Sequence, residues 1–545
     1  MLLAVSKELE EVGEFILRKL YHKEYIKASF IGNEELSIFY DSLYTHGGEE
    51  DDEEEGFIEV RSKYFDLDGG VIIKVGDGLL VARKGLNPSF NIFYFVGDKL
   101  VISDSFKVIW VLMKEIEENT TLSNFMEVFY LRHLPVDKTL IREIERLPPI
   151  SQVKFKKRNK KWIISSRTEF EVFANRKPSS ISNPVVIFEE SMERFLGKLF
   201  QIEEMEEIPI LLSGGIDSTL LLAIAKSYVE RHKVGKRLVT YTFPLKADKN
   251  YAKLVCEQMG VENRTISWSE DSHFLIHQFK DFVLTHGYPI FHPGFFQLAF
   301  KEVDNELIFW NQGIEDVTLG REELRIIHNL ERLDFLHPFV DVISNRSGLS
   351  VIRDFIKEKD EVMLFLSLRS LIPLGHSSCQ QELVFKAREI KALEVSLSKK
   401  IGLFSLLNGF CSDPLNLGKI LISPVISSHF LRMSIFIPDE LLVRGRYDRF
   451  IERILLARFK APKEIYLKRE RDTWEKQAAS WFLKMQEYHY KNINFLREVG
   501  VFPKKIEENL ISRLDSQKNV YFLSSFAELL RSFFENSSFK LQLQR

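Results

Sequence analysis

Two patterns of apolar and polar positions divide the chain. In the first part, short β-branched and aromatic runs alternate with Gly, Asp and Asn, which favour turns. These runs occupy residues 70–75, 78–83, 91–96 and 99–103. We expect them to form the strands of antiparallel hairpins.

A second pattern begins near Asn183, where helical periodicity replaces the short runs. Apolar strands then alternate with helices, which is the arrangement that builds a parallel, doubly wound sheet. The strands are expected at residues 208–212, 237–243 and 263–268, and the helices at 188–200, 219–229 and 251–259. From about residue 350 onward the pattern predicts mostly helices.

Composition places the chain among folded, soluble proteins. Its 545 residues are enough for two large domains or roughly three to four of ordinary size. Apolar residues make up 45% and charged residues 28%, which allows buried cores without general disorder. The 75 basic and 78 acidic residues nearly balance, so no global field draws the chain to nucleic acid or anionic lipid.

The cysteines, histidines and hydrophobic segments indicate the cellular compartment and exclude some kinds of metal and disulfide site. Cys256, Cys379 and Cys411 form no CxxC pair, which disfavours disulfides or a thiolate zinc site and fits a reducing cytosol. The histidines show no HExxH arrangement, so we assign no zinc. Lys7 and Glu8 interrupt the apolar N-terminus too early for a signal peptide, and no long uncharged apolar run follows. We therefore expect a cytoplasmic protein without a membrane span.

A strand, a turn and a helix are predicted to meet at residues 211–219, whose sequence is LLSGGIDST. Gly214 and Gly215 carry no side chains, so backbone N–H groups can converge there on a phosphate, aided by the dipole of the following helix. Asp217 would repel bare phosphate, and we expect it to hold the Mg²⁺ that accompanies a nucleotide. Further hydroxyl donors come from Ser213, Ser218 and Thr219. The loop is not a Walker loop, because the Lys of GxxxxGK[ST] is absent.

The SGGIDS string resembles the pyrophosphate-binding PP-loop of the ATP pyrophosphatase superfamily, whose members adenylate a carbonyl oxygen and release pyrophosphate. Further stretches resemble the asparagine synthetase family within that superfamily. They are its central N-terminal hairpins at residues 79–83, 92–96 and 100–104, the segment closing its N-terminal domain at 137–149, and its second, acidic loop at 311–320. Because these stretches keep the family's order, the resemblance covers nearly the whole chain.

The resemblance implies an α/β fold in two parts. Residues 1–182 would form a degenerate, β-rich, glutamine-amidotransferase-like domain of the N-terminal-nucleophile type. Residues 183–545 would form a PP-loop synthetase domain with a doubly wound parallel sheet and a helical C-terminal part. ATP and Mg²⁺ would bind there, with Asp217 and Asp316 holding the metal. The nucleotide would lie on Leu211, Ser213, Gly214, Gly215, Asp217, Ser218 and Thr219.

Three departures from the family pattern change the expected reaction. Family members hydrolyse glutamine with a cysteine that Met1 removal exposes, but position 2 of this chain is Leu2. In the second loop Val317 follows Asp316, so the usual Asp-Glu pair is incomplete, and Ser427 stands where an acidic residue is usual. Glutamine would therefore supply no ammonia, and the amine must come from elsewhere.

The C-terminal basic segment, residues 444–471, is similar to that of the lasso-peptide cyclases, although an expected Lys position reads Glu470. These enzymes close an amide between a peptide's N-terminal amine and an Asp or Glu side chain, and they too lack the cysteine nucleophile. A fixed cation would lower the energy of the oxyanion that forms as AMP leaves. Lys468 and Arg471, together with Asp316, are the catalytic candidates. We expect macrolactam closure of a peptide substrate, with a leader peptidase as partner.

Other functions fit part of the pattern. Within the family, asparagine synthesis from free ammonia, β-lactam-type ring closure and modification of another protein stay open. A non-catalytic scaffold would fit the incomplete second loop but not the intact SGGIDS string. An RNA-modifying PP-loop enzyme would need a basic or cysteine-bearing RNA-binding region, which neither the charge balance nor the cysteine spacing provides.

Overall fold

The computed structural model describes residues 2–328 and 396–534, with gaps. The longer gaps are residues 30–35, 48–57, 64–69, 123–136, 170–182, 290–299, 404–418, 468–473 and 500–516, and gaps of one to four residues occur elsewhere. Residues 329–395 and 535–545 lie outside the described part. Lys468 and Arg471, two of the predicted catalytic residues, therefore lie outside the described residues.

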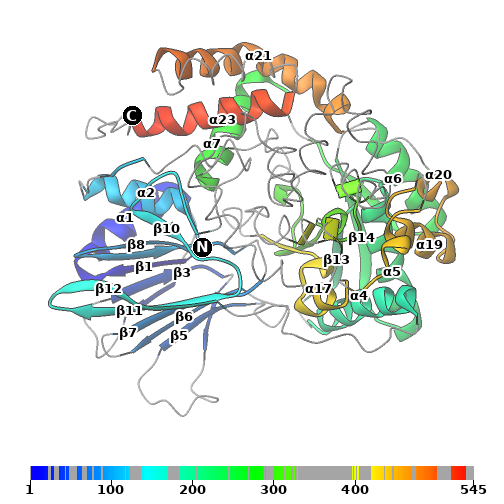
Figure 1. The fold of residues 1–545 in the computed structure, drawn as a ribbon, viewed down its shortest axis with the longest axis horizontal. Coiled ribbons are helices and arrows are strands. Elements are labelled where there is room, and N and C mark those ends of the chain that lie inside the picture. Colours follow the sequence, from blue (N-terminus) through cyan, green and yellow to red (C-terminus); the bar gives the residue numbers. More distant parts are fainter. Residues whose placement is uncertain are drawn as a thin grey trace, which may run out of the picture.

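The first part of the chain forms two six-stranded antiparallel sheets (Figure 1). The first sheet contains, in spatial order, β10 (Ile144–Arg146), β8 (Phe93–Val96), β9 (Leu100–Ser103), β1 (Leu2–Ser6), β3 (Leu36–Tyr40) and β2 (Ile26–Ser29). The second contains β12 (Lys161–Glu169), β11 (Ser151–Arg158), β7 (Leu79–Lys84), β6 (Val71–Gly76), β5 (Ile58–Ser62) and β4 (Tyr44–Gly47). The predicted hairpins are confirmed, because β6 pairs with β7 and β8 with β9 in antiparallel register.

Two helices, α1 (Glu10–Tyr21) and α2 (Phe106–Glu115), pack on the first of these sheets (Figure 1). One face of α2 is apolar, and its buried residues are Phe106, Val108, Ile109, Trp110, Leu112 and Met113. This spacing gives the helix a continuous apolar stripe. The N-terminal part thus stacks a helical layer on two sheets.

The second part contains a five-stranded parallel sheet. Its strands, in spatial order, are β15 (Glu262–Thr265), β14 (Arg237–Thr242), β13 (Glu207–Leu211), β16 (Leu307–Phe309) and β17 (Ile420–Ile422). The helices are α4 (Pro184–Phe200) before β13, the crossovers α5 (Ile216–His232) and α6 (Lys246–Met259), and α7 (Ser272–His286) after β15. The predicted α/β class and the alternation of strands with helices are confirmed.

Strand order reverses next to β13. The chain runs from β13 through β14 to β15, and then returns to the other side of β13 as β16. In open α/β sheets, ligands bind at the carboxyl ends of the strands where such a reversal occurs. The turn after β13 and the loop after β16 both leave the sheet at this edge.

The element boundaries differ in detail from the expected ones. Helix α4 begins before residue 188, because the Asn183 side chain accepts a hydrogen bond from the N–H of Val186 at 3.4 Å and caps the helix. Strand β15 ends at Thr265, short of the expected residue 268. Strand β17, only three residues long, was not predicted in a region expected to be helical. A run that short carries no usable periodicity.

The C-terminal part is helical, as predicted. Besides the 3₁₀ turn at Pro424–Ile426, it contains α17 (Ser428–Ser434), α18 (Asp439–Leu442), α19 (Phe450–Arg458), α20 (Lys463–Tyr466), α21 (Trp474–Glu498) and α23 (Gln517–Phe534). Helix α23 lies within the region that the pattern predicts to be mostly helical. Among the described helices, none combines the length and the apolar character that a membrane span requires.

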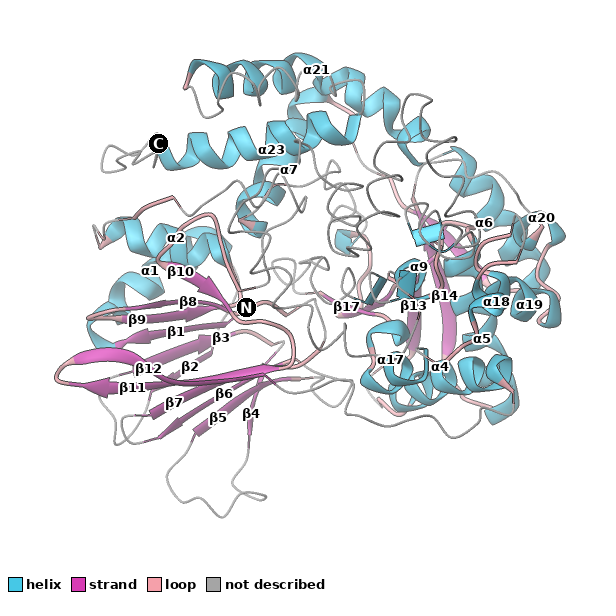
Figure 2. Cartoon of the chain, viewed as in Figure 1, coloured by secondary structure: helices cyan, strands magenta, loops and turns pink. Residues whose placement is uncertain are grey.

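Helices α21, α23 and α7 pack together and rest on α2 of the N-terminal part (Figure 2). The Lys107 ammonium lies 2.9 Å from the Asp281 carboxylate, and the Trp110 and Phe533 rings meet edge-to-face at 4.7 Å. Gly287 ends α7 so close to Phe106 that a Cβ there would lie 2.3 Å from the ring. The two parts of the chain are thus held together by close packing.

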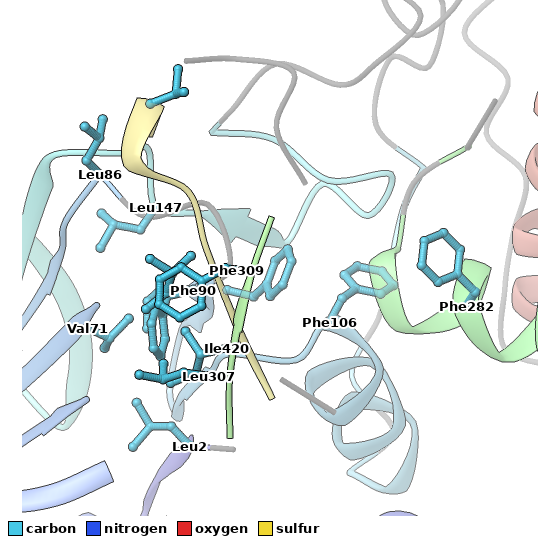
Figure 3. Packing of buried hydrophobic residues seen from close by; sticks show 14 of the residues in the cluster. Leu2, Val71, Leu86, Phe90, Phe106, Leu147, Phe282, Leu307, Phe309 and Ile420 are labelled. Atoms are coloured by element: carbon cyan, nitrogen blue, oxygen red, sulfur yellow. The ribbon is translucent and has the colours of Figure 1, made fainter. Parts of the chain in front are cut away.

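A second contact joins the N-terminal sheets to the parallel sheet. Buried apolar side chains from both parts belong to one hydrophobic cluster, in which Leu2 and Phe90 lie near Leu307, Phe309 and Ile420 (Figure 3). Leu2 is 0% exposed. Strands β16 and β17 therefore pack against the region where the N-terminal strand begins.

Candidate active site

The turn between β13 and α5 has the geometry of an anion-binding loop. Gly214 has a φ of 71°, and a Cβ there would lie 2.4 Å from the Tyr251 Cβ and 2.6 Å from the Ala252 nitrogen. Only glycine fits such a position, since both the backbone angle and the space exclude a side chain. Gly215 is exposed and caps the 17-residue helix α5, whose first N–H groups therefore face outward with the positive end of the helix dipole.

Two serine hydroxyls hold the turn in shape. The Ser213 and Ser218 Oγ atoms lie 3.1 Å apart, and the Ser218 Oγ also accepts a hydrogen bond from the Ser213 N–H at 3.3 Å. The Gly215 N–H donates to the Ser213 Oγ at 3.3 Å. These hydroxyls and N–H groups gather within one turn, and their contact with a phosphate stays a prediction.

The other two predicted contact residues have buried side chains. Leu211 is 2% exposed and packs with Val239 and Ile308, so only its backbone could face a nucleotide. Thr219 is 0% exposed, and within the described residues its hydroxyl has no hydrogen-bond partner. A buried hydroxyl without a partner costs about 1–3 kcal/mol, which a bound group or water would offset. The role of Thr219 as a phosphate donor stays a prediction.

Asp217 lies on the first turn of α5 and meets a cation from the distant helix α19. The Arg449 Nη1 lies 3.1 Å from the Asp217 Oδ1, and the two side chains are 13% and 23% exposed. The Asn311 side chain donates to the Asp217 backbone carbonyl at 2.7 Å, which ties the loop after β16 to the PP-loop. The charge of Asp217 also acts on the buried Glu452 carboxyl and raises its pKa. Three segments of the chain therefore converge on Asp217.

The charges of this group shift its titration. Burial by itself would lower the pKa of Arg449, but the charges of Asp217, Glu452, Asp448 and Glu315 raise it above its ordinary value. Burial, and after it the charge of Asp217, raise the pKa of Glu452 well above its ordinary value, while Arg449 acts in the opposite direction. The site thus combines a permanently charged guanidinium with a surplus of carboxyl groups.

The second acidic loop follows β16 and includes α9 (Ile314–Val317). Asp316, the predicted metal ligand, is 0% exposed. Glu315 is half-buried, accepts a hydrogen bond from the Gly313 N–H at 3.1 Å, and is among the charges acting on Arg449. At the loop's end, a Cβ on Gly320 would lie 2.3 Å from the Arg449 Nε. The loop therefore lies directly against the Asp217–Arg449 pair.

Sequence reasoning missed Glu315, Arg449 and Glu452. Glu315 precedes Asp316, so the sequence does contain two adjacent acidic residues, in an order that we did not match to the usual pair. Arg449 lies inside the basic segment at 444–471, where no residue pattern distinguishes it from its basic neighbours. Glu452 carries no local signal, because its hydrogen bond with Thr318 joins residues 134 positions apart in the sequence.

Ser427, which stands where an acidic residue is usual, has a structural role. It is 0% exposed, its Oγ donates to the Pro424 carbonyl at 2.8 Å, and the Phe430 N–H donates to that Oγ at 3.2 Å. Ser427 thus caps the start of α17. With serine in place of the usual acidic residue, the hydrogen bonds of this turn and of the start of α17 are formed.

The chemistry of the described residues fits Mg²⁺. Asp217 and Glu315 are partly exposed carboxylates on facing loops, and Asp316 is adjacent. Within the described residues no three His, Cys, Asp or Glu side chains form a metal site by themselves. Mg²⁺ commonly takes one or two carboxylates and completes its shell with phosphate oxygens and water.

A family model of asparagine synthase matches residues 201–283. The matched segment contains β13, the SGGIDS turn, α5, β14, α6 and β15. No match was found among curated proteins. The match shows that this segment is similar to asparagine synthases, and it supports an ATP-dependent, amide-forming ligase chemistry in general.

Proposed function

We propose that the protein adenylates a substrate carboxylate with ATP, releases pyrophosphate, and joins the activated carboxylate to an amine of a peptide, closing a macrolactam. The observation that carries the proposal is the glycine turn between β13 and α5, with Asp217 facing the second acidic loop at the sheet's point of reversal. The match over residues 201–283 supports the ligase class.

In the first step, the pyrophosphate portion of ATP lies on the turn at residues 213–218, where N–H groups and hydroxyls orient it. Asp217 and Asp316, with Glu315 beside them, would hold Mg²⁺, which neutralises charge on the departing pyrophosphate when bound. The substrate carboxylate attacks the α-phosphorus, and the bond to the bridging oxygen breaks as pyrophosphate leaves. Arg449 lies close enough to add positive charge on this side of the turn.

In the second step, the substrate amine attacks the acyl carbon, AMP leaves, and the amine loses a proton. Lys468 and Arg471 are the proposed cations for the oxyanion formed in this step. Amide formation outcompetes hydrolysis only if amine and acyl-adenylate are held together away from water. An amine on the same peptide meets this requirement without any supply of free ammonia.

Loss of the glutaminase nucleophile favours an amine carried by the substrate. Position 2 is Leu2, whose side chain is buried in the joint between the sheets, and the first cysteine of the chain is Cys256, buried on α6. The proposed partners are therefore a peptide substrate and the peptidase that removes its leader. Asparagine synthesis from free ammonia, β-lactam-type closure and a non-catalytic scaffold are the competing functions.

The ligase class is tested by ATP–pyrophosphate exchange in the presence of candidate carboxylate substrates. Asp217→Asn should lower exchange at least about 100-fold, because it removes charge from the proposed metal ligand without removing volume. Asp271→Asn is the matched control, since Asp271 caps α7 away from the turn and should leave exchange unchanged. Wild-type exchange in Asp217→Asn would contradict the adenylation site, and no exchange with any substrate would favour the scaffold.

The macrolactam is tested with purified protein, Mg-ATP and a leader-free peptide. We expect a product that has lost one water and resists proteases, formed much more slowly by Lys468→Ala and Asp316→Ala. Asparagine formed from aspartate and ammonia, without peptide dehydration, would refute the cyclase while leaving the ligase class in place.

A further inference from the structure

Asn311 lies where the second acidic loop meets the PP-loop. It follows β16 by two residues, and because Phe309 of β16 pairs with Ile210 of β13, Asn311 is level with the beginning of the turn after β13. The Trp310 N–H donates to the Ile422 carbonyl at 3.0 Å, which fixes the backbone just before Asn311. Asn311 is 3% exposed. Its side chain therefore has a defined place between the two loops.

One hydrogen bond fixes which way the Asn311 amide points. The Asn311 Nδ2 donates to the Asp217 backbone carbonyl at 2.7 Å. A carbonyl oxygen can only accept, so the amide atom nearer to it has to be the nitrogen. Within the described residues the buried Asn311 Oδ1 has no hydrogen-bond partner. Since the two heavy atoms that end an amide group are about 2.2 Å apart, this oxygen lies within about 5 Å of the Asp217 carbonyl oxygen.

The chemistry of the two loops indicates what pairs with this oxygen. A buried acceptor without a donor is unfavourable, and a ligand that pairs with it offsets the cost. Phosphate and carboxylate oxygens are acceptors themselves and would be repelled. The same two loops carry the carboxyl groups of Asp217, Glu315 and Asp316, which favour a cation. Carbonyl and carboxylate oxygens are ligands that suit Mg²⁺, and a neutral oxygen joins the shell without adding negative charge.

We propose that the Asn311 Oδ1 is an oxygen ligand of the Mg²⁺ held by Asp217, so that one side chain binds the metal through its oxygen and ties the two loops together through its nitrogen. The inference rests on the proposed function, because it assumes that Asp217 holds the metal. Groups that bind or orient a metal ion change its affinity about 10–100-fold when they are lost.

Two substitutions separate the metal ligand from the tie between the loops. Asn311→Leu keeps the approximate volume and removes both the oxygen and the N–H group. Asn311→Asp keeps an oxygen at the Oδ1 position and loses only the bond that Asn311 donates to Asp217.

Mn²⁺ is the probe, because it takes the same oxygen ligands as Mg²⁺. Its binding is measured from the EPR signal of the free ion, in the presence of α,β-methylene-ATP, which cannot release pyrophosphate. We expect Asn311→Leu to raise the dissociation constant of Mn²⁺ at least about tenfold. Asn311→Asp should bind Mn²⁺ at least as tightly as wild type.

An asparagine near the opposite end of the same strand provides the control. The Asn305 Nδ2 donates to the Glu207 carbonyl at 3.1 Å, so it makes the same type of bond before the amino end of β16. The turn after β13 lies at the carboxyl end of the sheet, and Asn305→Leu should therefore leave the dissociation constant of Mn²⁺ unchanged.

The outcomes are distinct. Equal weakening of Mn²⁺ binding in Asn311→Leu and Asn311→Asp would show that only the N–H group matters, and it would overturn the role of Asn311 as a metal ligand. Wild-type binding in Asn311→Leu would overturn it as well. If Asn311→Leu does not fold, Asn311→Ala removes the same two groups and has the same expected result. Failure of the proposed function is seen separately, because Asp217→Asn would then bind Mn²⁺ as tightly as wild type.

Discussion

His489 should make the free energy of unfolding fall as the pH is lowered from 7.5 to 5. The residue is 0% exposed on α21, and its ring packs against Phe279, Phe482 and Tyr521. Its Nδ1 lies 2.8 Å from the Ser524 Oγ, whereas within the described residues its Nε2 has no hydrogen-bond partner. Burial lowers the pKa of His489 from 6.5 to about 3, so the folded protein keeps the ring neutral.

The size of the effect follows from the two pKa values. In the unfolded chain His489 regains a pKa near 6.5, so between pH 6.5 and pH 3 the unfolded state binds the additional proton. Stability then rises with pH across this window and is lost on acidification. From pH 7.5 to pH 5 the loss from this residue is about 2 kcal/mol.

Urea unfolding curves measured at several pH values test this prediction. His489→Gln and His489→Phe should lose about 2 kcal/mol less than wild type between pH 7.5 and 5, whatever their stability at pH 7.5. His273→Gln is the matched control, since His273 is exposed on α7, and it should follow the wild-type curve. A wild-type pH dependence in both His489 variants would refute the assignment of a neutral, buried ring.

Three further predictions concern the turn, the N-terminal part and α17. Gly214→Ala should lower the free energy of unfolding by more than about 2 kcal/mol and abolish nucleotide binding, because φ is 71° and Tyr251 occupies the space that the Cβ would need. Gly260→Ala is the control: its φ is 63° but its surroundings are open, so it should lower the free energy of unfolding by about 1 kcal/mol and keep pyrophosphate exchange. Added glutamine should release no glutamate above background, which an enzyme-coupled glutamate assay checks; stoichiometric release would reveal a nucleophile other than a cysteine at position 2. Ser427→Ala should lower the free energy of unfolding by about 1 kcal/mol, because the α17 cap is lost, and should leave pyrophosphate exchange intact. A loss of exchange in a folded variant would show that Ser427 contributes to the active site.

Local patterns in the sequence predicted most of the fold. The hairpins β6–β7 and β8–β9 are encoded by β-branched runs with turn residues between them, and the alternation from α4 to β15 is encoded by apolar strands and periodic helices. These signals extend over a few residues to a few turns. The three-residue β17 could not be predicted, because it pairs with β16, which lies more than 100 residues away in the sequence.

The candidate site was predictable to a smaller extent. The SGGIDS turn is local, so its residue types alone indicated where N–H groups and Asp217 would gather. Arg449 reaches Asp217 from the start of a helix more than 200 residues later, and helical periodicity cannot tell which face of α19 meets α5. Glu315 was visible as a neighbour of Asp316, but only its position beside Arg449 gives it a role.

The packing of Leu2 gives the start of the chain a structural role. Strand β1 lies between β3 and β9 in its sheet, and the Ser103 hydroxyl donates to the Leu2 carbonyl at 2.8 Å. The Leu2 side chain belongs to the cluster that includes Phe309 and Ile420 (Figure 3), so it adds apolar contact to the joint with the parallel sheet. Burying a leucine is worth about 1.5–3 kcal/mol. The joint packs against β16, and the loop that follows β16 carries the acidic residues facing Asp217. Removing the N-terminal part would therefore expose apolar surface next to that loop.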